Sequence, residues 1–422
     1  MKRFLFVMFE GGGNVPPQIG IARRLVARGH VVRVLSDPAV EPDARAAGCD
    51  FAAFRSAPRH NCRSRTDDRV KDWLPRSPIG QLERMTGEVM FGPAAAYARD
   101  VLAEIERFAP DALAVDFMLF GALVAAEKSR LPTATLMHTT YAMPAQGVPP
   151  FGMGFSPARG PLGRARDRLL GGMMAWIFDR KGRAPVNAAR AELGLAPLAR
   201  VFDQVARGAR VLVLTTRSYD FAALTALPAG VVYVGPQLDD PAWAAPWASP
   251  WPAGATDPLV VVALGSTFQN QSGLTQRIID ALGGLPVRGL VTLGDVFAPT
   301  DFRLPANVVA VGSAPHAAVL PQARAVIAHG GHGTVMKALA HGLPLLTVPL
   351  GRDQADNAAR VVEAGAGLRA RPSAGIAALR RTIARLLAEP VFAECARRMA
   401  GAIARDVAED RATGELEALA AV

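Results

Sequence analysis

The sequence predicts an α/β protein of two doubly wound domains that face each other across a cleft. Three observations predict this fold. Apolar strands, glycine turns and helical stretches alternate in the first half of the chain and again in the second half. A segment rich in proline and small residues separates the two halves. The length of 422 residues suits two domains of about 200 residues each.

The first domain is expected at residues 1–234. Four apolar runs predict its buried strands: FLFVMF, HVVRVLS, DALAVDF and TATLMHT. The stretch PQIGIARRLVARG has the period of a helix, and Gly29 is expected to end it as a C-terminal cap. The N-terminal MKRFLFVMF is short and has no cleavage site, so we expect a buried strand there rather than a signal peptide.

Residues 235–258, GPQLDDPAWAAPWASPWPAGATDP, lack both helical and strand periodicity and predict a linker. The alternation returns at residues 259–390, which predicts the second domain. Its expected strands are LVVVALGS, VRGLVTLG, VVAVGS, AVIAHGG and PLLTVPL. We expect residues 391–422 to form helices that pack back on the first domain.

Two segments differ from this pattern, residues 55–100 and 142–205. The second contains PPFGMGFSPARGPLGRARDRLLGGMMAWIF, where glycine and proline alternate with arginine and then with bulky apolar side chains. Because glycine and proline disfavour a long helix, we expect irregular walls of a binding site. A basic amphipathic helix lying at a membrane surface is the alternative.

Composition excludes several classes of protein. Half of the residues are hydrophobic and the net charge is +10, but no basic run is interleaved with aromatic residues as nucleic-acid binding would favour. The charge suits anionic small molecules, an anionic surface, or a solvated basic exterior. Cys49, Cys62 and Cys395 have unrelated spacings, which disfavours disulfides and zinc and favours a reducing cytoplasm. The sequence contains no uninterrupted apolar stretch of about 18 residues, so we expect no transmembrane segment.

The most specific motif is AVIAHGGHGTVMKALAHGLPLLTVPLGRDQADNAARVVEAGAG, residues 325–367. A strand ends before His329, and glycines let the chain turn into a helix that begins near Thr334. The free amides at such a helix start bind phosphate, and His329 can donate to a diphosphate oxygen. Asp353 and Gln354 follow the next strand and suit vicinal sugar hydroxyls.

HGGHGT and GRDQADNA together resemble the donor-binding signature of family 1 glycosyltransferases, the group of bacterial natural-product and macrolide glycosyltransferases. GSAPHAAVLPQARAVIAHGG and NVPPQIGIARRLVARGH resemble the family before its signature and in its first loop and helix, so the resemblance covers essentially the whole chain. It implies the GT-B fold, two facing Rossmann-like domains with an interdomain cleft. It also implies sugar transfer without a metal, and the sequence contains no Asp-x-Asp pair.

The resemblance implies roles for individual donor-site residues. The residues implied to hold the donor diphosphate are Ser266, His329, Gly331, Gly333 and Thr334. Asp353 and Gln354 would hold the sugar, Ala314 would offer its backbone to the base, and His316 would lie near the nucleoside. Two positions depart from the family, since Ser313 replaces a stacking aromatic residue and Lys337 replaces a glutamate that accepts the ribose hydroxyls. An ammonium cannot accept hydrogen bonds, so we expect the relative affinity to shift from UDP-sugars towards dTDP-sugars, unless Lys337 faces solvent.

The acceptor site departs from the family as well. Asn14 occupies the position of the family's general-base histidine, and Asp116 occupies that of its orienting aspartate. Because an amide cannot take up a proton at useful pH, we expect Asp116 to act as the base and Asn14 to position the acceptor or a water. An acceptor that ionises easily, or a loss of catalysis, would also account for an asparagine at this position. Glu10 and His138, at the ends of predicted strands, are reserve bases.

The expected function is an inverting, metal-independent glycosyltransferase that uses a dTDP- or UDP-sugar and needs no other cofactor. The expected acceptor is a lipophilic small molecule such as a secondary-metabolite aglycone. Alternatives are a membrane glycolipid acceptor, which Arg159, Arg164, Arg166 and Arg168 would suit, and a non-catalytic helper of the same fold. A dinucleotide-dependent oxidoreductase is excluded because no G-x-G-x-x-G has the required context. We expect a monomer or a homodimer.

Overall fold

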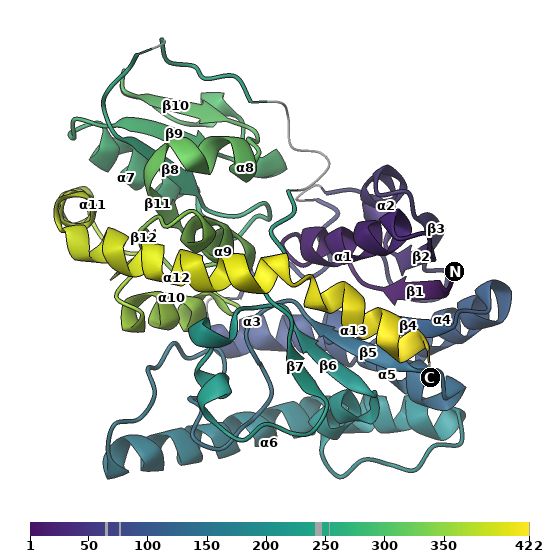
Figure 1. Ribbon diagram of the computed structural model, residues 1–422. Coiled ribbons are helices and arrows are strands. Elements are labelled where there is room, and N and C mark those ends of the chain that lie inside the picture. Colours follow the sequence, from purple (N-terminus) through teal and green to yellow (C-terminus); the bar gives the residue numbers. More distant parts are fainter. Residues whose placement is uncertain (64–65, 76, 241–246, 253, 422) are drawn as a thin grey trace. The chain divides into compact units, whose positions relative to one another are not determined.

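The computed structural model describes residues 1–63, 66–75, 77–240, 247–252 and 254–421 (Figure 1). The chain divides into two compact units. Unit 1 comprises Met1–Phe151, Pro157–Ala242 and Asp406–Val422, and unit 2 comprises Gly152–Ser156 and Trp243–Arg405. Part of the expected linker, residues 241–246 and 253, lies outside the described residues; the rest of 235–258 forms no helix or strand.

Unit 1 is built on a parallel sheet with the strand order β3-β2-β1-β4-β5-β6-β7. The strands are β1 Arg3–Val7, β2 Val31–Ser36, β3 Asp50–Ala53, β4 Ala112–Asp116, β5 Thr133–Met137, β6 Arg210–Val213 and β7 Val231–Tyr233. All four predicted strands are present. The strand order reverses between β1 and β4, which is the switch point where such sheets place their ligands, beyond the carboxyl ends of the strands.

Alternate residues of β1 point to opposite faces of this sheet. Phe4 and Phe6 pack into the core under α1 and α13, whereas Leu5 and Val7 pack into the core formed with α4 and α5. The helices of unit 1 are α1 Val15–Ala27, α2 Glu41–Ala46, α3 Pro78–Met85, α4 Ala94–Phe108, α5 Phe120–Ser129, α6 Pro161–Glu192 and α13 Arg411–Ala420. α1 ends before Gly29, whose φ of +84° confirms the predicted glycine cap.

The expectation that glycine and proline break up residues 142–205 is wrong for its central part. Residues Pro161–Glu192 form one helix, α6, although Pro185 lies inside it. Tertiary packing offsets the poor helix propensity in the C-terminal half. A side chain at Gly182 would come within 2.8 Å of the Phe91 ring, so glycine permits close contact there, and the buried Arg190 pairs with Glu127 at 2.6 Å.

Unit 2 has a second parallel sheet with the strand order β10-β9-β8-β11-β12-β13. Its strands are β8 Leu259–Ala263, β9 Arg288–Thr292, β10 Val308–Val311, β11 Ala323–Ala328, β12 Leu345–Thr347 and β13 Gly367–Arg369. Its helices are α7 Ser272–Leu282, α8 His316–Val319, α9 His332–Ala340, α10 Gln354–Glu363, α11 Ile376–Ala388 and most of α12 Pro390–Ala408. The five predicted strands are present, and the order reverses between β8 and β11.

The last residues of the chain belong to unit 1. From Asp406 the chain joins that unit, and α13 packs on the same face of the sheet as α1. Arg28 at the end of α1 forms ion pairs with Asp410 and with Glu417, the latter at 2.7 Å. Leu416 is fully buried in the core between α13 and the sheet.

We predict that Leu416→Ala destabilises the protein by about 2–5 kcal/mol, because it leaves a cavity in a closely packed core. Urea unfolding followed by circular dichroism measures the change. Leu224→Ala is the control, since Leu224 is 83% exposed and its truncation should change stability by less than about 0.5 kcal/mol. Equal stability of the two variants would show that α13 contributes little to unit 1.

Candidate active site

Asp116 ends β4 at the switch point of unit 1 and is fully buried, with 0% exposure. Its Oδ2 accepts hydrogen bonds from Gln18 Nε2 at 2.7 Å and from Asn14 Nδ2 at 3.1 Å. Its Oδ1 accepts from the backbone N–H of Met118 at 3.0 Å. A buried carboxylate is costly unless it is paired, and these donors supply the pairing.

Asn14, at the start of α1, is bound to the protein through both ends of its amide. Besides Asp116, Nδ2 donates to the Phe9 carbonyl at 2.9 Å, and Oδ1 accepts from the N–H of Gly11 at 3.1 Å. These bonds close the glycine turn between β1 and α1 and fasten it to β4. The geometry gives Asn14 the role of holding the turn and the carboxylate in place.

His138 follows β5, the neighbour of β4, and lies beside the same carboxylate. Its Nδ1 is 3.2 Å from Oδ2 of Asp116, and its ring packs on Phe117 with 5.0 Å between ring centroids. The ring is not aligned for a hydrogen bond from Nδ1 to this carboxylate, but a proton on Nδ1 would face it and leave the lone pair on Nε2. The side chain is 18% exposed, and no described residue hydrogen-bonds to Nε2.

The three carboxylate and imidazole candidates for a base differ in their surroundings. Burial acts to raise the pKa of Asp116, but the His138 imidazole and the hydrogen bonds outweigh it and hold that pKa below its usual value. Glu10 pairs with Arg63 at 2.8 Å and accepts from the N–H of Gly12 at 2.7 Å. Both carboxylates are therefore engaged by donors of the protein, whereas the Nε2 lone pair of His138 faces away from its protein partner.

Gln18 is a site residue that the sequence analysis missed. It is fully buried and donates to Asp116 more closely than Asn14 does, and its Nε2 also donates to the Asn14 carbonyl at 3.0 Å. The signal was the spacing of four residues between Asn14 and Gln18, which places both side chains on one face of a helix.

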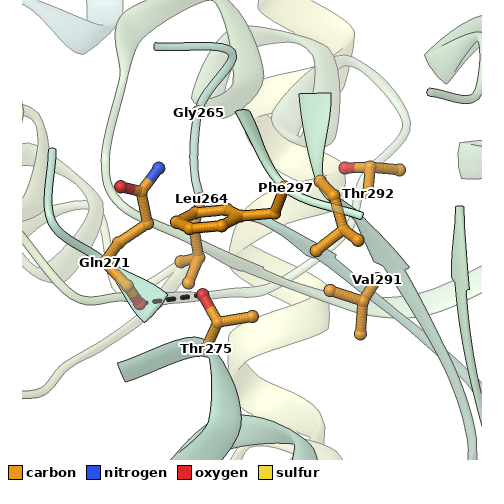
Figure 2. Close-up of a pocket in the computed structure, with 8 residues that line it drawn as sticks. Leu264, Gly265, Gln271, Thr275, Val291, Thr292 and Phe297 are labelled. Atoms are coloured by element: carbon orange, nitrogen blue, oxygen red, sulfur yellow. Dashed lines mark hydrogen bonds between the residues drawn. The ribbon is translucent and has the colours of Figure 1, made fainter. Parts of the chain in front are cut away.

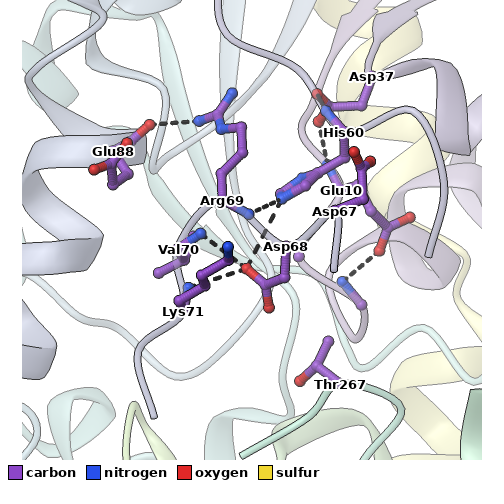
Figure 3. Close-up of polar contacts among 12 residues, drawn as sticks. Glu10, Asp37, His60, Asp67, Asp68, Arg69, Val70, Lys71, Glu88 and Thr267 are labelled. Atoms are coloured by element: carbon purple, nitrogen blue, oxygen red, sulfur yellow. Dashed lines mark hydrogen bonds and ion pairs between the residues drawn. The ribbon is translucent and has the colours of Figure 1, made fainter. Parts of the chain in front are cut away.

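The expected wall at residues 55–100 begins with a loop that is fastened to the ends of β1 and β2 (Figure 3). Asp37 accepts from the N–H of Glu10 at 2.6 Å and from the N–H of His60 at 2.8 Å. His60 Nε2 in turn accepts from the N–H of Arg69 at 2.9 Å. The loop therefore borders the same edge of the sheet; residues 64–65 and 76 of the expected wall lie outside the described part of the chain.

In unit 2 the glycine turn after β11 brings His329 close to β8. Its Nδ1 lies 3.3 Å from the Ala263 carbonyl, which can only accept, so Nδ1 carries a proton. Burial lowers the pKa of His329 to about 4. His329 is therefore neutral at pH 7, and Nε2 can donate to a diphosphate oxygen, as predicted, only after taking up a second proton. A side chain at Gly331 would come within 2.5 Å of Nε2, so glycine is required beside the ring.

The N-terminus of α9 provides the predicted amides. Gly331 is the N-cap and no side chain caps the helix, all residues of which the structure describes. The first amides of a helix have no intrahelical acceptor and carry a partial positive charge. A side chain at Gly333 would meet nothing within 4 Å, so the backbone is open there, and Thr334 is half-buried in the first turn.

The start of α10 lies beside this turn. Gly330 has a φ of +96°, and a side chain there would come within 2.7 Å of the Gln354 carbonyl. The buried Gln354 side chain accepts from the N–H of Leu350 at 2.7 Å and donates to Gln269 at 2.8 Å. Both predicted sugar ligands are therefore engaged in the protein, since Oδ2 of Asp353 accepts from Asn357 Nδ2 at 2.9 Å.

Arg352 is a second residue that the sequence analysis missed. Its φ of +55° is uncommon for a residue with a side chain, and its guanidinium donates to Thr267 Oγ1 at 3.2 Å. Its charge is close enough to His329 to lower the pKa of that imidazole, together with the larger effect of burial. The sequence offered no signal for this backbone conformation.

The remaining predicted donor residues lie at the same edge of the sheet. Ser266 follows β8 and is exposed, whereas Ala314, after β10, is buried and His316 begins α8. Figure 2 shows a small pocket at the loop after β8, with Leu264, Gly265 and Phe297 among its lining residues. Thr275 Oγ1 donates to the Gln271 carbonyl at 2.9 Å and steadies this loop.

The described residues contain no cluster of three or more histidine, cysteine or acidic side chains that could hold a metal ion. Within the same part of the chain, no helix combines the length and apolarity needed to cross a membrane.

Comparison with known proteins supports the sequence resemblance. Residues 276–419 match the family described as erythromycin biosynthesis protein CIII-like, C-terminal domain. The 4'-demethylrebeccamycin synthase of Lentzea aerocolonigenes is 29% identical over 401 residues, 92% of this chain and 93% of that protein. The solved glycotransferase of kitacinnamycin has 24% identity, a TM-score of 0.76 and 99% coverage of both chains. Glycosyltransferase VinC in complex with dTDP has 20% identity, a TM-score of 0.71 and 99% coverage of both. The predicted GT-B fold is confirmed.

We predict that the protein takes up a proton at His329 when a nucleoside diphosphate binds. The anion favours the imidazolium form of His329, whose pKa is about 4 in the free protein. The affinity for the nucleotide should therefore fall as pH rises from about 4, the pKa of His329 in the free protein, to the higher pKa of His329 in the complex. Calorimetry in buffers with different ionisation enthalpies measures the proton uptake. In His329→Gln the uptake should disappear; uptake equal to that of the natural protein would contradict a role for this imidazole.

Proposed function

We propose a specific reaction for this chain, which belongs with the glycosyltransferases of natural-product biosynthesis. It transfers a sugar from a nucleoside diphosphate donor, with dTDP favoured over UDP, to a hydroxyl of a lipophilic small-molecule acceptor. Transfer inverts the anomeric carbon and needs no metal. The observation that supports the proposal most directly is the contact between His138 and the buried Asp116, at the carboxyl edge where such sheets bind ligands.

We assign proton removal to His138. Its Nε2 lone pair takes the acceptor's hydroxyl proton while the oxygen attacks the anomeric carbon, and the diphosphate leaves with the electron pair of the broken bond. Asp116 keeps the ring oriented and stabilises the imidazolium, the part that a buried aspartate plays beside a catalytic histidine. Asn14 and Gln18 are positioning residues, since they hold the carboxylate and not the acceptor.

We assign the leaving diphosphate to the N-terminus of α9. The open backbone at Gly333, the hydroxyl of Thr334 and protonated His329 would donate to the diphosphate, and the charge of Arg352 would add to theirs. Such fixed donors stabilise the charge that develops on a leaving diphosphate, which is why no metal is required. Asp353 accepts hydrogen bonds from the sugar hydroxyls.

The nucleoside preference is inferred from Lys337 in α9. An ammonium cannot accept a hydrogen bond from a ribose 2′-hydroxyl, so the 2′-hydroxyl of UDP adds no affinity at Lys337 over dTDP. The structural neighbour solved with dTDP supports the same nucleotide for this chain.

We predict that His138→Gln lowers turnover of an acceptor with a high-pKa hydroxyl by about 10²–10⁴-fold and leaves donor affinity unchanged, because it removes only the proton acceptor. Turnover of an acidic phenol as acceptor should fall much less, since its hydroxyl ionises without a general base. Initial rates against pH, with donor affinity from calorimetry, measure both effects.

Two matched variants separate the roles. Asp116→Asn should lower turnover yet leave a residual rate on the high-pKa acceptor, as the His138 base remains, whereas His138→Gln should lose that rate. Asn14→Ala should lower turnover by about tenfold or less, because it removes only one or two hydrogen bonds. Full activity of His138→Gln with loss in Asp116→Asn would return the base to Asp116. Inactivity of the natural protein on broad acceptor panels despite tight nucleotide binding would favour a helper.

We predict that dTDP binds at least as tightly as UDP and that Lys337→Glu shifts the preference towards UDP, because a carboxylate can accept from the 2′-hydroxyl. Competition calorimetry with the two nucleotides measures the ratio. Lys337→Gln is the control, since it removes the charge without adding a carboxylate. A strong UDP preference in the natural protein would refute the assignment.

A further inference from the structure

The N-terminal half of α6 exposes a row of large apolar side chains. The exposed fractions are 87% for Leu162, 74% for Leu169, 43% for Met173 and 59% for Trp176. These residues are separated by steps of seven, four and three, so they lie on one face of the helix and span about 21 Å along its axis. We call these four residues the α6 apolar face.

The α6 apolar face differs from the other half of the same helix. Beyond Trp176 the helix is held in unit 1 by Phe178, which packs on Phe202 at 4.9 Å between centroids, and by the buried Val186 and Arg190. The helix is thus anchored at one end and presents apolar side chains at the other. Contiguous exposed apolar surface of this kind marks an interaction site more often than chance exposure.

Basic side chains continue and border this face. The Arg180 guanidinium lies 5.4 Å from the centre of the Trp176 ring, one turn further along the helix, and the exposed Arg183 follows it. Arg168 is exposed at the border of the face beside Leu169. The exposed surface around the α6 apolar face is therefore positively charged.

The carboxylates of α6 lie away from the α6 apolar face. Asp167 is buried against Arg166 at 2.6 Å, and Asp179 accepts from the N–H of Val201 at 2.7 Å. Glu192 is the last residue of the helix, at its anchored end. The positive charge beside the apolar side chains is thus not neutralised by acidic groups of the same face.

We propose that the α6 apolar face binds the surface of an anionic lipid bilayer. Leucine, methionine and tryptophan enter the boundary between headgroups and acyl chains, while the arginines extend to the lipid phosphates. Charge favours this occupant over a second copy of the chain. A second copy would bring arginines against arginines on a face that carries no carboxylate, whereas an anionic bilayer supplies the missing negative charge.

The test uses the full chain and vesicles of two compositions. We expect co-sedimentation with vesicles of phosphatidylcholine mixed with phosphatidylglycerol, little with phosphatidylcholine alone, and release as salt rises. The double variants Leu169→Gln/Trp176→Gln and Arg180→Gln/Arg183→Gln should each weaken binding by about tenfold or more. Because these side chains are exposed, circular dichroism should show that both variants remain folded.

Leu224→Gln and Arg303→Gln are the matched controls, since Leu224 is 83% and Arg303 is 87% exposed on other elements. Both should sediment like the natural protein. Failure of the natural protein to bind anionic vesicles overturns the proposal, as does equal weakening in the controls. A double variant that loses a dimer in solution but keeps its vesicle binding would assign the face to a second copy instead.

Discussion

The buried carboxylate of Asp116 is the interaction around which the candidate site of unit 1 is arranged. A negative charge without water must be met by donors, and here they come from the turn and helix after β1 and from the backbone after β4, with the His138 ring 3.2 Å away. Meeting that requirement fixes the glycine turn after β1, the first turn of α1 and the ring of His138 at once. Asn14 is then a donor to this carboxylate rather than a reactive group.

Sheet topology explains why these groups meet at all. In both units the strand order reverses beside the first strand, so the chain leaves neighbouring strands in opposite directions and opens a space at their carboxyl ends. Asn14, Asp116 and His138 follow three adjacent strands in unit 1. Ser266, His329 and Asp353 follow three adjacent strands in unit 2. Residues far apart in sequence are therefore brought to one edge in each unit without any special contact between their own segments.

The sequence predicted the architecture well because the spacing of its apolar residues matches the strands and helices of the folded protein. β1, β4 and the turn at His329 illustrate this agreement. It could not predict which nitrogen of His138 faces Asp116, since a strand end fixes where a residue lies but not its ring. Arg352 was missed because a positive φ leaves no trace in residue type. The length of α6 was missed because packing at Gly182 and Arg190 outweighs the propensities that predicted interruption.

The two histidines show how one tautomer can serve two kinds of chemistry. His138 and His329 both place Nδ1 beside a protein oxygen, at 3.2 Å and 3.3 Å, so Nε2 is the nitrogen left for a ligand. The oxygen beside His138 belongs to a carboxylate, which stabilises the imidazolium that proton removal would create. The oxygen beside His329 belongs to a neutral carbonyl, and burial keeps the pKa of that ring near 4. A cation forms there only when an anionic ligand compensates it, so binding of the diphosphate itself would generate the charge that then helps it to leave.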